Sequence, residues 1–340
     1  AIMVGTGLGA GNGILIRNGA VLEKVQKINA IAFDKTGTIT VGKPEIVDMK
    51  IIDETALEIA YSLEKVSEHP LADAFVKYAE KKVSVQKIGG FEAIPGKGIM
   101  GKIGKKECYL GNEKLMKENK IDISSNMISW KNENEEKGST VVLLAVSGKI
   151  IGAFAIADKI REDSREAIIR LKNLGLKTYM ITGDSKKVAA AVAGQAGIEE
   201  YFAEVLPADK AKIVEKIRAD GQVVAMVGDG INDAPALAVS DLGIAMGSGT
   251  DVAIETGDII LMKNSLLDVD KAIKLSKATM NKIKQNLFWA LVYNIIGIPI
   301  AAGVLWPFGI LLSPMIAGGA MALSSISVVS NSVLLNRIKL

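Results

Sequence analysis

The 340-residue chain has almost none of the side chains that build cysteine and histidine metal centres. It contains one cysteine, Cys108, and one histidine, His69. A single cysteine excludes an internal disulfide and a cysteine-built zinc site. A single histidine excludes the histidine clusters that bind transition metals.

The chain also lacks a strong charge of one sign, because its formal net charge is only +3. This value gives no electrostatic case for binding nucleic acid, and we expect no such partner. The hydrophobic fraction of 49% and the charged fraction of 23% exclude a disordered or fibrous chain. The length predicts two or three domains with room for buried cores.

One long stretch has no charge at all, since no Asp, Glu, Lys or Arg occurs between Lys284 and Arg337. A membrane-spanning helix needs about 20 apolar residues, so this stretch predicts two, over 285–305 and 310–335. Trp306-Pro307-Phe308-Gly309 favours a turn between them. Basic residues flank both ends, so we expect both ends in the cytoplasm and the hairpin in the lipid bilayer of a cell membrane. The alternative is a hairpin buried in a large soluble protein.

The first 20 residues lack an initiator methionine and the basic, apolar and small-residue order of a signal peptide. They are apolar and rich in glycine, and an amphipathic run through Lys24 and Lys27 follows them. We expect residues 1–28 to be the end of a membrane helix and a cytoplasmic stalk. On this interpretation the chain is a fragment of a longer protein.

Strands alternate with helices in much of the remaining chain, which predicts a parallel, doubly wound α/β sheet. Residues 45–154 have a different pattern, with helices rich in Lys and Glu and short alternating strands. They predict an inserted domain. The expected division is a sheet domain in two segments, the inserted domain, and a stalk that leads to the hairpin: 29–44 and 155–265, 45–154, and 266–284.

Open parallel sheets bind ligands at the carboxyl ends of their strands, and Asp34, Thr182 and Asp229 all follow predicted buried strands. A carboxylate can accept a phosphoryl group when a metal ion and hydrogen-bond donors neutralise the surrounding charge. Gly37 permits a tight turn whose N–H groups face an anion. Thr182 and Lys210 can bind the same phosphate, and Asp229 offers a second oxygen ligand for Mg²⁺. Each feature alone also occurs in ordinary turns and loops.

Three segments resemble the signature set of the P-type ATPases: Asp34-Lys35-Thr36-Gly37-Thr38-Ile39-Thr40, Thr182-Gly183-Asp184 and Gly228-Asp229-Gly230-Ile231-Asn232-Asp233. The resemblance runs the full length of the chain. It implies a haloacid-dehalogenase-like Rossmannoid sheet, the phosphorylation domain, in an enzyme that hydrolyses ATP through an aspartyl phosphate on Asp34. It also implies Mg²⁺ held by Asp34, the Thr36 carbonyl and Asp229, and Asp233 at a hinge coupled to domain movement. The implied catalytic residues are Asp34, Lys35, Thr36, Thr182, Gly183, Asp184, Lys210 and Asp233.

The inserted block then resembles the α+β nucleotide-binding domain of the heavy-metal (type IB) subgroup. Ser67-Glu68-His69-Pro70 matches a subgroup motif whose histidine stacks near adenine. The implied ATP contacts are Glu68, His69, Gly96, Gly98, Gly111 and Asn112. Gly96–Gly101 also fits G-x-G-x-x-G, but strand-like residues 103–110 follow it instead of a helix, which argues against a dinucleotide site.

The uncharged hairpin carries the residues that bear on the transported ion. Met321, Ser324 and Ser325 share one helix face, a thioether suits Cu(I), and polar groups inside a membrane helix are candidates for function. Small residues and methionine also simply pack membrane helices. Together with Tyr293-Asn294, this pattern resembles the last two helices of copper pumps. It implies export of Cu(I), or of Ag(I), with Tyr293, Asn294, Met321, Ser324 and Ser325 as the metal site.

Several parts of the family pattern are absent from this sequence: the Cys-Pro-Cys metal site, the actuator domain with its Thr-Gly-Glu loop, the earlier membrane helices and any Cys-x-x-Cys domain. The expected partners are therefore the remainder of the same pump, the lipid bilayer and a cytosolic copper chaperone. Alone, the chain is expected to bind nucleotide and to autophosphorylate, but not to transport.

Three alternatives remain open at this point. A soluble phosphatase of the haloacid-dehalogenase class would share the Asp34 site, but would normally have a second Asp where this chain has Thr36. A non-catalytic nucleotide-binding subunit would not need Asp34. A pump for Zn(II), for another divalent cation or for potassium is expected to have a charged residue in its membrane helices, and the stretch between Lys284 and Arg337 has none.

Overall fold

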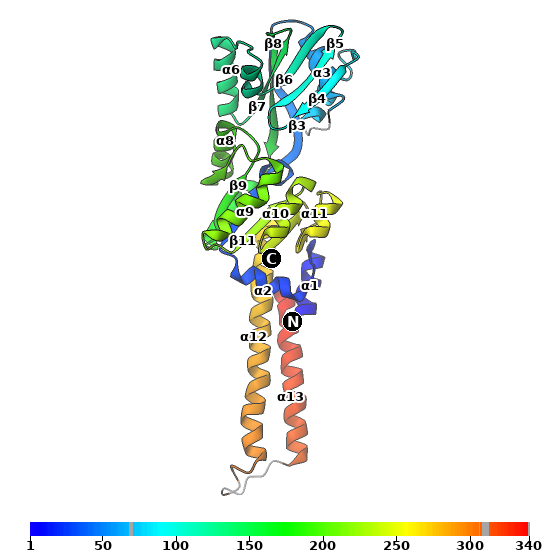
Figure 1. Ribbon diagram of the computed structural model, residues 1–340. Coiled ribbons are helices and arrows are strands. Elements are labelled where there is room, and N and C mark those ends of the chain that lie inside the picture. The colour runs from blue at the N-terminus through cyan, green and yellow to red at the C-terminus, as the bar shows by residue number, and fades with distance from the viewer. Residues whose placement is uncertain (68–70, 306, 308–312, 339–340) are drawn as a thin grey trace.

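The computed structural model describes residues 1–67, 71–305, 307 and 313–338. Its parts lie roughly in a line: a domain with an antiparallel sheet, a domain with a mainly parallel sheet, and a long hairpin of two helices (Figure 1). The mainly parallel sheet, with a second sheet domain inserted into its sequence, agrees with the α/β fold expected from the sequence.

The sheet of the middle domain has seven strands in the order β1-β13-β12-β11-β2-β9-β10. Neighbouring strands are parallel, except that β1 runs antiparallel to β13. In this order the strands are Ile14–Ile16, Ile259–Leu261, Leu242–Met246, Val224–Gly228, Ala30–Asp34, Lys177–Ile181 and Glu200–Phe202.

Helices cover both faces of this sheet. Ile31 and Phe33 of β2 pack into one core, while Ala30 and Ala32 pack into the other. The strand is therefore apolar throughout, as expected for a strand buried on both sides. The first face is covered by α2 (Gly19–Lys27), α7 (Ser164–Asn173), α8 (Lys186–Ala196) and the start of α12 (Leu267–Ala301), and the second by α9 (Lys210–Ala219) and α10 (Ala234–Val239). The short helix α11 is Asp251–Thr256.

The inserted domain is a six-stranded antiparallel sheet in the order β3-β8-β7-β6-β5-β4. Its strands are Thr40–Ile51, Lys149–Ile160, Thr140–Val146, Lys106–Gly111, Gly98–Ile103 and Gly89–Ile94. Helices α3 (Ala56–Glu64) and α4 (Ala72–Ala79) pack on one face, and α5 (Glu113–Glu118) and α6 (Ser125–Glu136) pack on the other. The long strands β3 and β8 connect the two domains, beginning with the pair Thr40 and Ile160.

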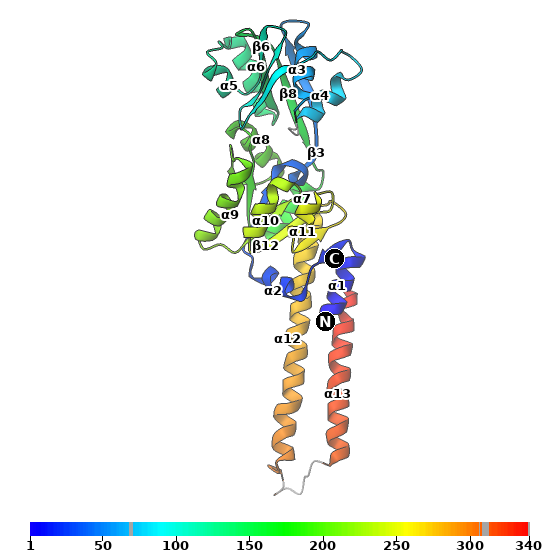
Figure 2. The same cartoon turned by 45° about the vertical axis from the view of Figure 1, so that its right-hand side comes forward.

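The helices α12 and α13 (Pro314–Val333) run side by side away from the parallel sheet, as both views show (Figures 1 and 2). Helix α12 continues without a break through the predicted stalk at 266–284 and into the predicted span at 285–305, ending at Ala301. The predicted second span began at 310, and residues 310–312 lie outside the described part. Measured by length and hydropathy, no helix among the described residues qualifies as a membrane span.

The start of the chain forms α1 (Ile2–Gly11), which crosses α12 closely. A Cβ atom on Gly5 would lie 2.4 Å from the Thr279 hydroxyl oxygen, so only glycine permits this approach. After α1 the chain enters the parallel sheet as β1, paired with β13, before forming α2.

Candidate active site

Three carboxyl groups and one lysine meet at the carboxyl end of the parallel sheet. Asp34 ends β2, Asp229 follows β11, and Asp233 lies in the short turn before α10. One carboxylate oxygen from each lies within 4.8 Å of the others. Lys210, the first residue of α9, places its Nζ 2.5 Å from Asp34 Oδ1 and 2.7 Å from Asp233 Oδ1. The structure thus brings together four of the residues selected from the sequence.

The local fold explains why these groups meet. Strands β2 and β11 are parallel neighbours with Phe33 opposite Val227, so Asp34 and Asp229 leave the sheet side by side. Asp233 Oδ2 accepts hydrogen bonds from the N–H groups of Asp229 (3.3 Å) and Gly230 (3.2 Å), which fixes the loop after β11. Two sequence positions four residues apart are held together in this way.

The cluster is buried and short of positive charge. Asp34 is 4% exposed, Asp233 1% and Lys210 9%. Burial, followed by repulsion from Asp233, raises the pKa of Asp34 to about 7, against the opposing effect of Lys210. Burial and Asp233 likewise raise the pKa of Asp229 to about 6. Burial works against the charged amine of Lys210, but Asp34 and Asp233 raise its pKa above the ordinary value.

The raised pKa values of Asp34 and Asp229 reflect burial and mutual repulsion among three carboxyl groups, which Lys210 only partly offsets. A divalent cation would remove the repulsion, and the carboxylate oxygens are the hard donors that Mg²⁺ prefers. The turn after Asp34 leaves room for this group: Gly37 has φ of +70°, and a Cβ there would lie 1.7 Å from Asp229 Oδ2. The residues therefore fit Mg²⁺, which the chain would hold through Asp34 and Asp229.

Lys35, Thr182 and Asp184 form a second group beside Asp34. Lys35 forms an ion pair with Asp184, and the Thr182 hydroxyl donates to Asp184 Oδ2 at 2.7 Å. Although burial opposes its charge, Lys35 holds the pKa of the Asp184 carboxyl below its usual value. Thr140 also donates to Asp184 Oδ1 at 2.7 Å, and it comes from the inserted domain. Gly183, between Thr182 and Asp184, is exposed.

Arg161 braces the loop that follows Asp34, and the sequence interpretation did not select it. Its guanidinium donates to the carbonyls of Gly37 (2.7 Å), Thr38 (3.1 Å) and Asn264 (3.0 Å). Thr36, whose carbonyl was expected to bind Mg²⁺, lies exposed in this loop. Nothing in the sequence distinguishes Arg161 among the 41 lysines and arginines.

Asp158 was also missed. Its carboxylate accepts from the Thr40 hydroxyl (2.5 Å) and from the N–H groups of Gly42 (3.0 Å) and Lys43 (3.0 Å). These bonds join β8 to β3 where the chain passes from one domain to the other. Its place near the end of a long strand gives no sequence signal for such a role.

In the inserted domain, four of the six expected nucleotide contacts lie together. Gly98 pairs with Gly111 across β5 and β6, so close that a Cβ on Gly98 would lie 2.5 Å from the Gly111 Cα. The Asn112 N–H donates to the Lys97 carbonyl (2.8 Å), and its side chain donates to the Gly96 carbonyl (2.9 Å). Glu68 and His69 lie outside the described residues.

Glu64, at the end of α3, is a buried acid that the sequence interpretation also missed. It is 5% exposed, and its Oε2 has no hydrogen-bond partner among the described residues. Burial raises the pKa of Glu64 to about 7, with the Ser67 hydroxyl opposing this shift. The residue is therefore neutral over much of the range below pH 7.

The hairpin residues expected to bind the transported ion do not form a closed cluster. Tyr293 places its hydroxyl 3.4 Å from the Ser327 hydroxyl on α13, while the Asn294 side chain donates to the Ala290 carbonyl of its own helix. Met321 is 73% exposed, and Ser325 is exposed beside a half-buried Ser324.

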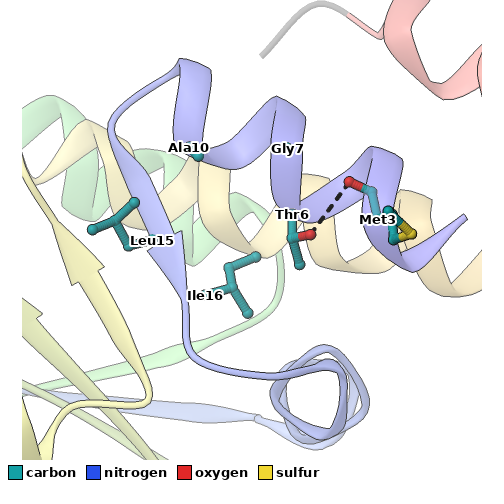
Figure 3. Close-up of a pocket in the computed structure, with 6 residues that line it drawn as sticks. All are labelled: Met3, Thr6, Gly7, Ala10, Leu15 and Ile16. Atoms are coloured by element: carbon teal, nitrogen blue, oxygen red, sulfur yellow. Dashed lines mark hydrogen bonds between the residues drawn. The ribbon is translucent and has the colours of Figure 1, made fainter.

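A separate hollow lies between α1 and β1 (Figure 3). It is lined by Met3, Thr6, Gly7, Ala10, Leu15 and Ile16. The Thr6 hydroxyl faces the carbonyls of Ile2 (3.1 Å) and Met3 (3.3 Å) of its own helix. The lining has no titratable side chain, so the hollow offers no acid, base or metal ligand for catalysis.

The parallel sheet thus carries an acid cluster at its carboxyl end and an inserted domain between β2 and β9. The family model of the haloacid dehalogenase-like hydrolases matches residues 28–241. This match assigns the sheet domain to that family.

Relatives narrow the class. The chain is 46% identical to a copper-exporting P-type ATPase of Legionella pneumophila, covering 100% of this chain and 47% of the relative. It is 50% identical to a probable copper-importing P-type ATPase A of Enterococcus hirae, covering 99% and 46%. The chain therefore spans about half the length of these curated relatives.

Solved structures agree. A zinc-transporting PIB-type ATPase in the E2.Pi state superposes with a TM-score of 0.72 at 36% identity, covering 99% of this chain and 54% of that one. The catalytic domain of the CPx-ATPase CopB-B superposes with a TM-score of 0.62 at 33% identity, covering 78% and 96%. The chain belongs to the P-type ATPases, in the group that includes these PIB-type and CPx enzymes.

Proposed function

We propose that this chain is the ATP-hydrolysing core of a P-type cation pump and that Asp34 is the residue it phosphorylates. The observation that carries the proposal is the buried cluster of Asp34, Lys210, Asp229 and Asp233, in which three acids share one lysine. Such a site favours the arrival of a divalent cation and a phosphate group together, because each compensates the other's charge.

In the proposed step, a carboxylate oxygen of Asp34 attacks the γ-phosphorus of ATP. The bond from that phosphorus to the β,γ-bridging oxygen breaks, and ADP leaves with the electron pair. Lys210 and the Thr182 hydroxyl stabilise the charge on the transferred group, and Mg²⁺ supplies Lewis-acid stabilisation when it is bound by Asp34, Asp229 and the Thr36 carbonyl. Asp233 positions Lys210 and the loop that carries Asp229, and water later cleaves the aspartyl phosphate.

The inserted domain is proposed to hold the nucleotide. Gly96 is exposed, while Gly98 and Gly111 lie so close together that a side chain on either would clash with the backbone. The three glycines thus shape the surface beside Asn112. Asn112 fixes this surface through its bonds to residues 96 and 97. Glu68 and His69 complete the proposed ATP contacts.

The hairpin is proposed to lie in the membrane beside other helices of a longer pump, with the catalytic domains in the cytoplasm. The support is the outward display of large apolar side chains, among them Leu287, Phe288, Ile295, Ile298, Met315, Met321 and Ile326. An exposed apolar surface of this size marks a contact with lipid or with other protein. The rest of the pump, the bilayer and a copper chaperone are the proposed partners.

Cu(I), or Ag(I), is the proposed cargo, with Tyr293, Asn294, Met321, Ser324 and Ser325 as its ligands or neighbours in the pathway. The names of the two curated relatives support copper but differ in direction, since one is an exporter and the other a probable importer. Export from the cytosol is the direction we propose. Metal-stimulated ATPase activity and uptake into inside-out vesicles, measured on the full-length protein with Cu(I), Ag(I) and Zn(II), test cargo and direction together.

The first test is phosphorylation of the chain with Mg²⁺ and γ-labelled ATP, quenched in acid. We expect an acid-stable, hydroxylamine-sensitive label that Asp34→Asn abolishes and that the exposed control Asp220→Asn retains. A label that survives in Asp34→Asn would overturn the assignment. Turnover of a simple phosphate ester without any trapped label would instead favour a soluble phosphatase.

A further inference from the structure

We propose that Thr140 is a positioning residue for phosphoryl transfer, through which the inserted domain sets the geometry of the Asp34 site. The inference rests on the proposed function. It starts from one hydrogen bond that crosses between the two domains: the Thr140 hydroxyl donates to Asp184 Oδ1 at 2.7 Å.

Asp184 is where three groups of the phosphoryl site meet. Its Oδ2 pairs with the Lys35 amine and accepts the Thr182 hydroxyl at 2.7 Å, while Thr182 Oγ1 accepts the Asp184 N–H at 3.1 Å. Its Oδ1 takes the Thr140 hydroxyl. The Asp184 carboxylate therefore orients Lys35 and Thr182, and Thr140 orients the carboxylate.

The number of hydrogen-bond donors to the Asp184 carboxylate explains why Thr140 affects the reaction. The Thr182 hydroxyl has one proton and donates it to Asp184, so it must leave Asp184 to donate to a phosphate. When Thr182 leaves, Asp184 Oδ2 is still paired with the Lys35 amine, and Asp184 Oδ1 still accepts the hydrogen bond from Thr140. Without Thr140, Oδ1 loses this donor, and the mostly buried carboxylate holds the Thr182 proton more tightly.

The distance between the Thr140 hydroxyl and Asp184 depends on the position of the inserted domain. It is the first residue of β7 and pairs with Ile156 of β8, the strand that leads back to the parallel sheet. The preceding segment lies against α8: Lys187 donates to the Asn132 side chain at 2.8 Å, and a Cβ on Gly138 would lie 3.4 Å from Val192 Cγ2. A shift of this domain relative to α8 would therefore move the Thr140 hydroxyl away from Asp184.

A simpler role for Thr140 is packing at the start of a strand, and a matched set of variants separates the two. Thr140→Val keeps the shape and removes the hydroxyl, and Thr140→Ser restores it. Thr178→Val is the control for the exchange itself, because Thr178 is a buried strand residue whose hydroxyl has no partner among the described residues. Asn132→Ala is the control for domain contact, since it breaks the bond to Lys187 without touching Asp184.

The experiment measures the rate of phosphoenzyme formation at saturating ATP, together with the dissociation constant of a non-hydrolysable ATP analogue. In Thr140→Val we expect the rate to fall about tenfold, the size of effect typical of a lost hydrogen bond to a charged group. We expect analogue binding to stay within about twofold, because the proposed nucleotide surface is intact. Thr140→Ser should recover most of the rate, and Thr178→Val and Asn132→Ala should resemble wild type.

A double-mutant cycle adds a readout that packing does not predict. In an Asp184→Asn background, Thr140→Val should have little further effect on the rate, since both changes act through one carboxylate. Wild-type rate in Thr140→Val, or equal loss in Thr178→Val, would overturn the inference while leaving the proposed function intact. Absence of any label in wild type would overturn the proposed function, and the inference with it.

Discussion

The two sheets of this chain use their charged residues in different ways. The parallel sheet gathers Asp34, Asp229, Asp233 and Lys210 in a buried cluster at its strand ends. The antiparallel sheet has closely packed glycines at its expected nucleotide contacts, and several of its domain's ion pairs, such as Lys97–Glu118, are open to solvent. Buried charges depend on each other strongly, whereas solvent screens exposed pairs. Substitutions at the parallel sheet should therefore change chemistry, and those at the antiparallel sheet should mainly change affinity or stability.

The largest effect is expected for Lys210→Met. It removes the one amine that lies between Asp34 and Asp233, leaving buried carboxylates to repel each other and the incoming phosphate. We expect phosphoenzyme formation to fall by about 10²–10³-fold, the range seen when a preorganised charge donor is lost. Rapid-quench labelling at saturating ATP and Mg²⁺ measures this.

Lys212→Met is the matched control for that substitution. Lys212 lies two residues further along α9, is exposed and pairs only with Asp209 among the described residues. It should label at nearly the wild-type rate. A Lys210→Met protein within threefold of wild type would remove the contrast between the sheets.

Glu64 is a buried acid of the inserted domain, where we expect a substitution to change stability instead of chemistry. Its pKa is about 7 in the folded chain against an ordinary 4.5, so the folded state holds the proton more tightly than the unfolded state. The free energy of unfolding therefore falls as pH rises from 4.5 to 7, by about 3 kcal/mol. Glu64→Gln removes this pH dependence, so the Tm of the variant should rise relative to that of wild type as pH increases from 5 to 8.

The exposed Glu54→Gln provides the control for Glu64. Thermal unfolding of both variants at pH 5 and pH 8 gives the comparison. A constant Tm difference between Glu64→Gln and wild type across that range would mean that Glu64 is ionised throughout.

Gly37→Ala should have a smaller effect, on metal binding. The added Cβ would lie 1.7 Å from Asp229 Oδ2, so either the loop or the carboxylate must move. We expect the Mg²⁺ concentration for half-maximal phosphorylation to rise about tenfold, since a carboxylate ligand is displaced. Gly197→Ala has a similar φ of +81° but meets nothing within 4 Å, so it should add backbone strain of about 1 kcal/mol without the Mg²⁺ effect.

The smallest effect is expected for Lys114→Ala, which breaks the ion pair to Glu204 between the two domains. Its side chains are 63% and 43% exposed, so the pair contributes at most about 1 kcal/mol. ATP affinity should change less than about threefold, and the exchanged pair Lys114→Glu with Glu204→Lys should restore wild-type behaviour. A tenfold loss would show that the domain contact is tightly coupled to nucleotide binding.

Much of the parallel sheet could be predicted from the sequence because its central strands β2, β11 and β12 are largely apolar. The sequence predicts buried strands before Asp34, Thr182 and Asp229, and the structure has β2 ending at Asp34, β9 at Ile181 and β11 at Gly228. The role of Ile14–Ile16 could not be predicted in this way. Its strand is only three residues long and pairs with β13, more than 240 positions away, so no local periodicity marks it.

The residues of the candidate site also fall into a group that could be predicted from the sequence and a group that could not. Asp34, Thr182 and Asp229 follow strands, and strand ends of one parallel sheet meet at one edge, so their proximity was predictable. Arg161, Asp158 and Thr140 act through backbone carbonyls, backbone amides and one distant carboxylate. Such partners leave no spacing rule in the sequence, because they depend on how two domains and a loop pack.

Asn264 connects the loop after Asp34 to the base of α12. Its carbonyl accepts from the same Arg161 that holds Gly37 and Thr38, its φ is +54°, and α12 begins three residues later. Helix α12 has 35 residues without a break, which at 1.5 Å per residue makes a rod of about 50 Å. A tilt of about 5° at its base would carry the far end through about 4–5 Å. If α12 moves as a rigid rod, a small rotation at its base is therefore amplified several-fold at its far end.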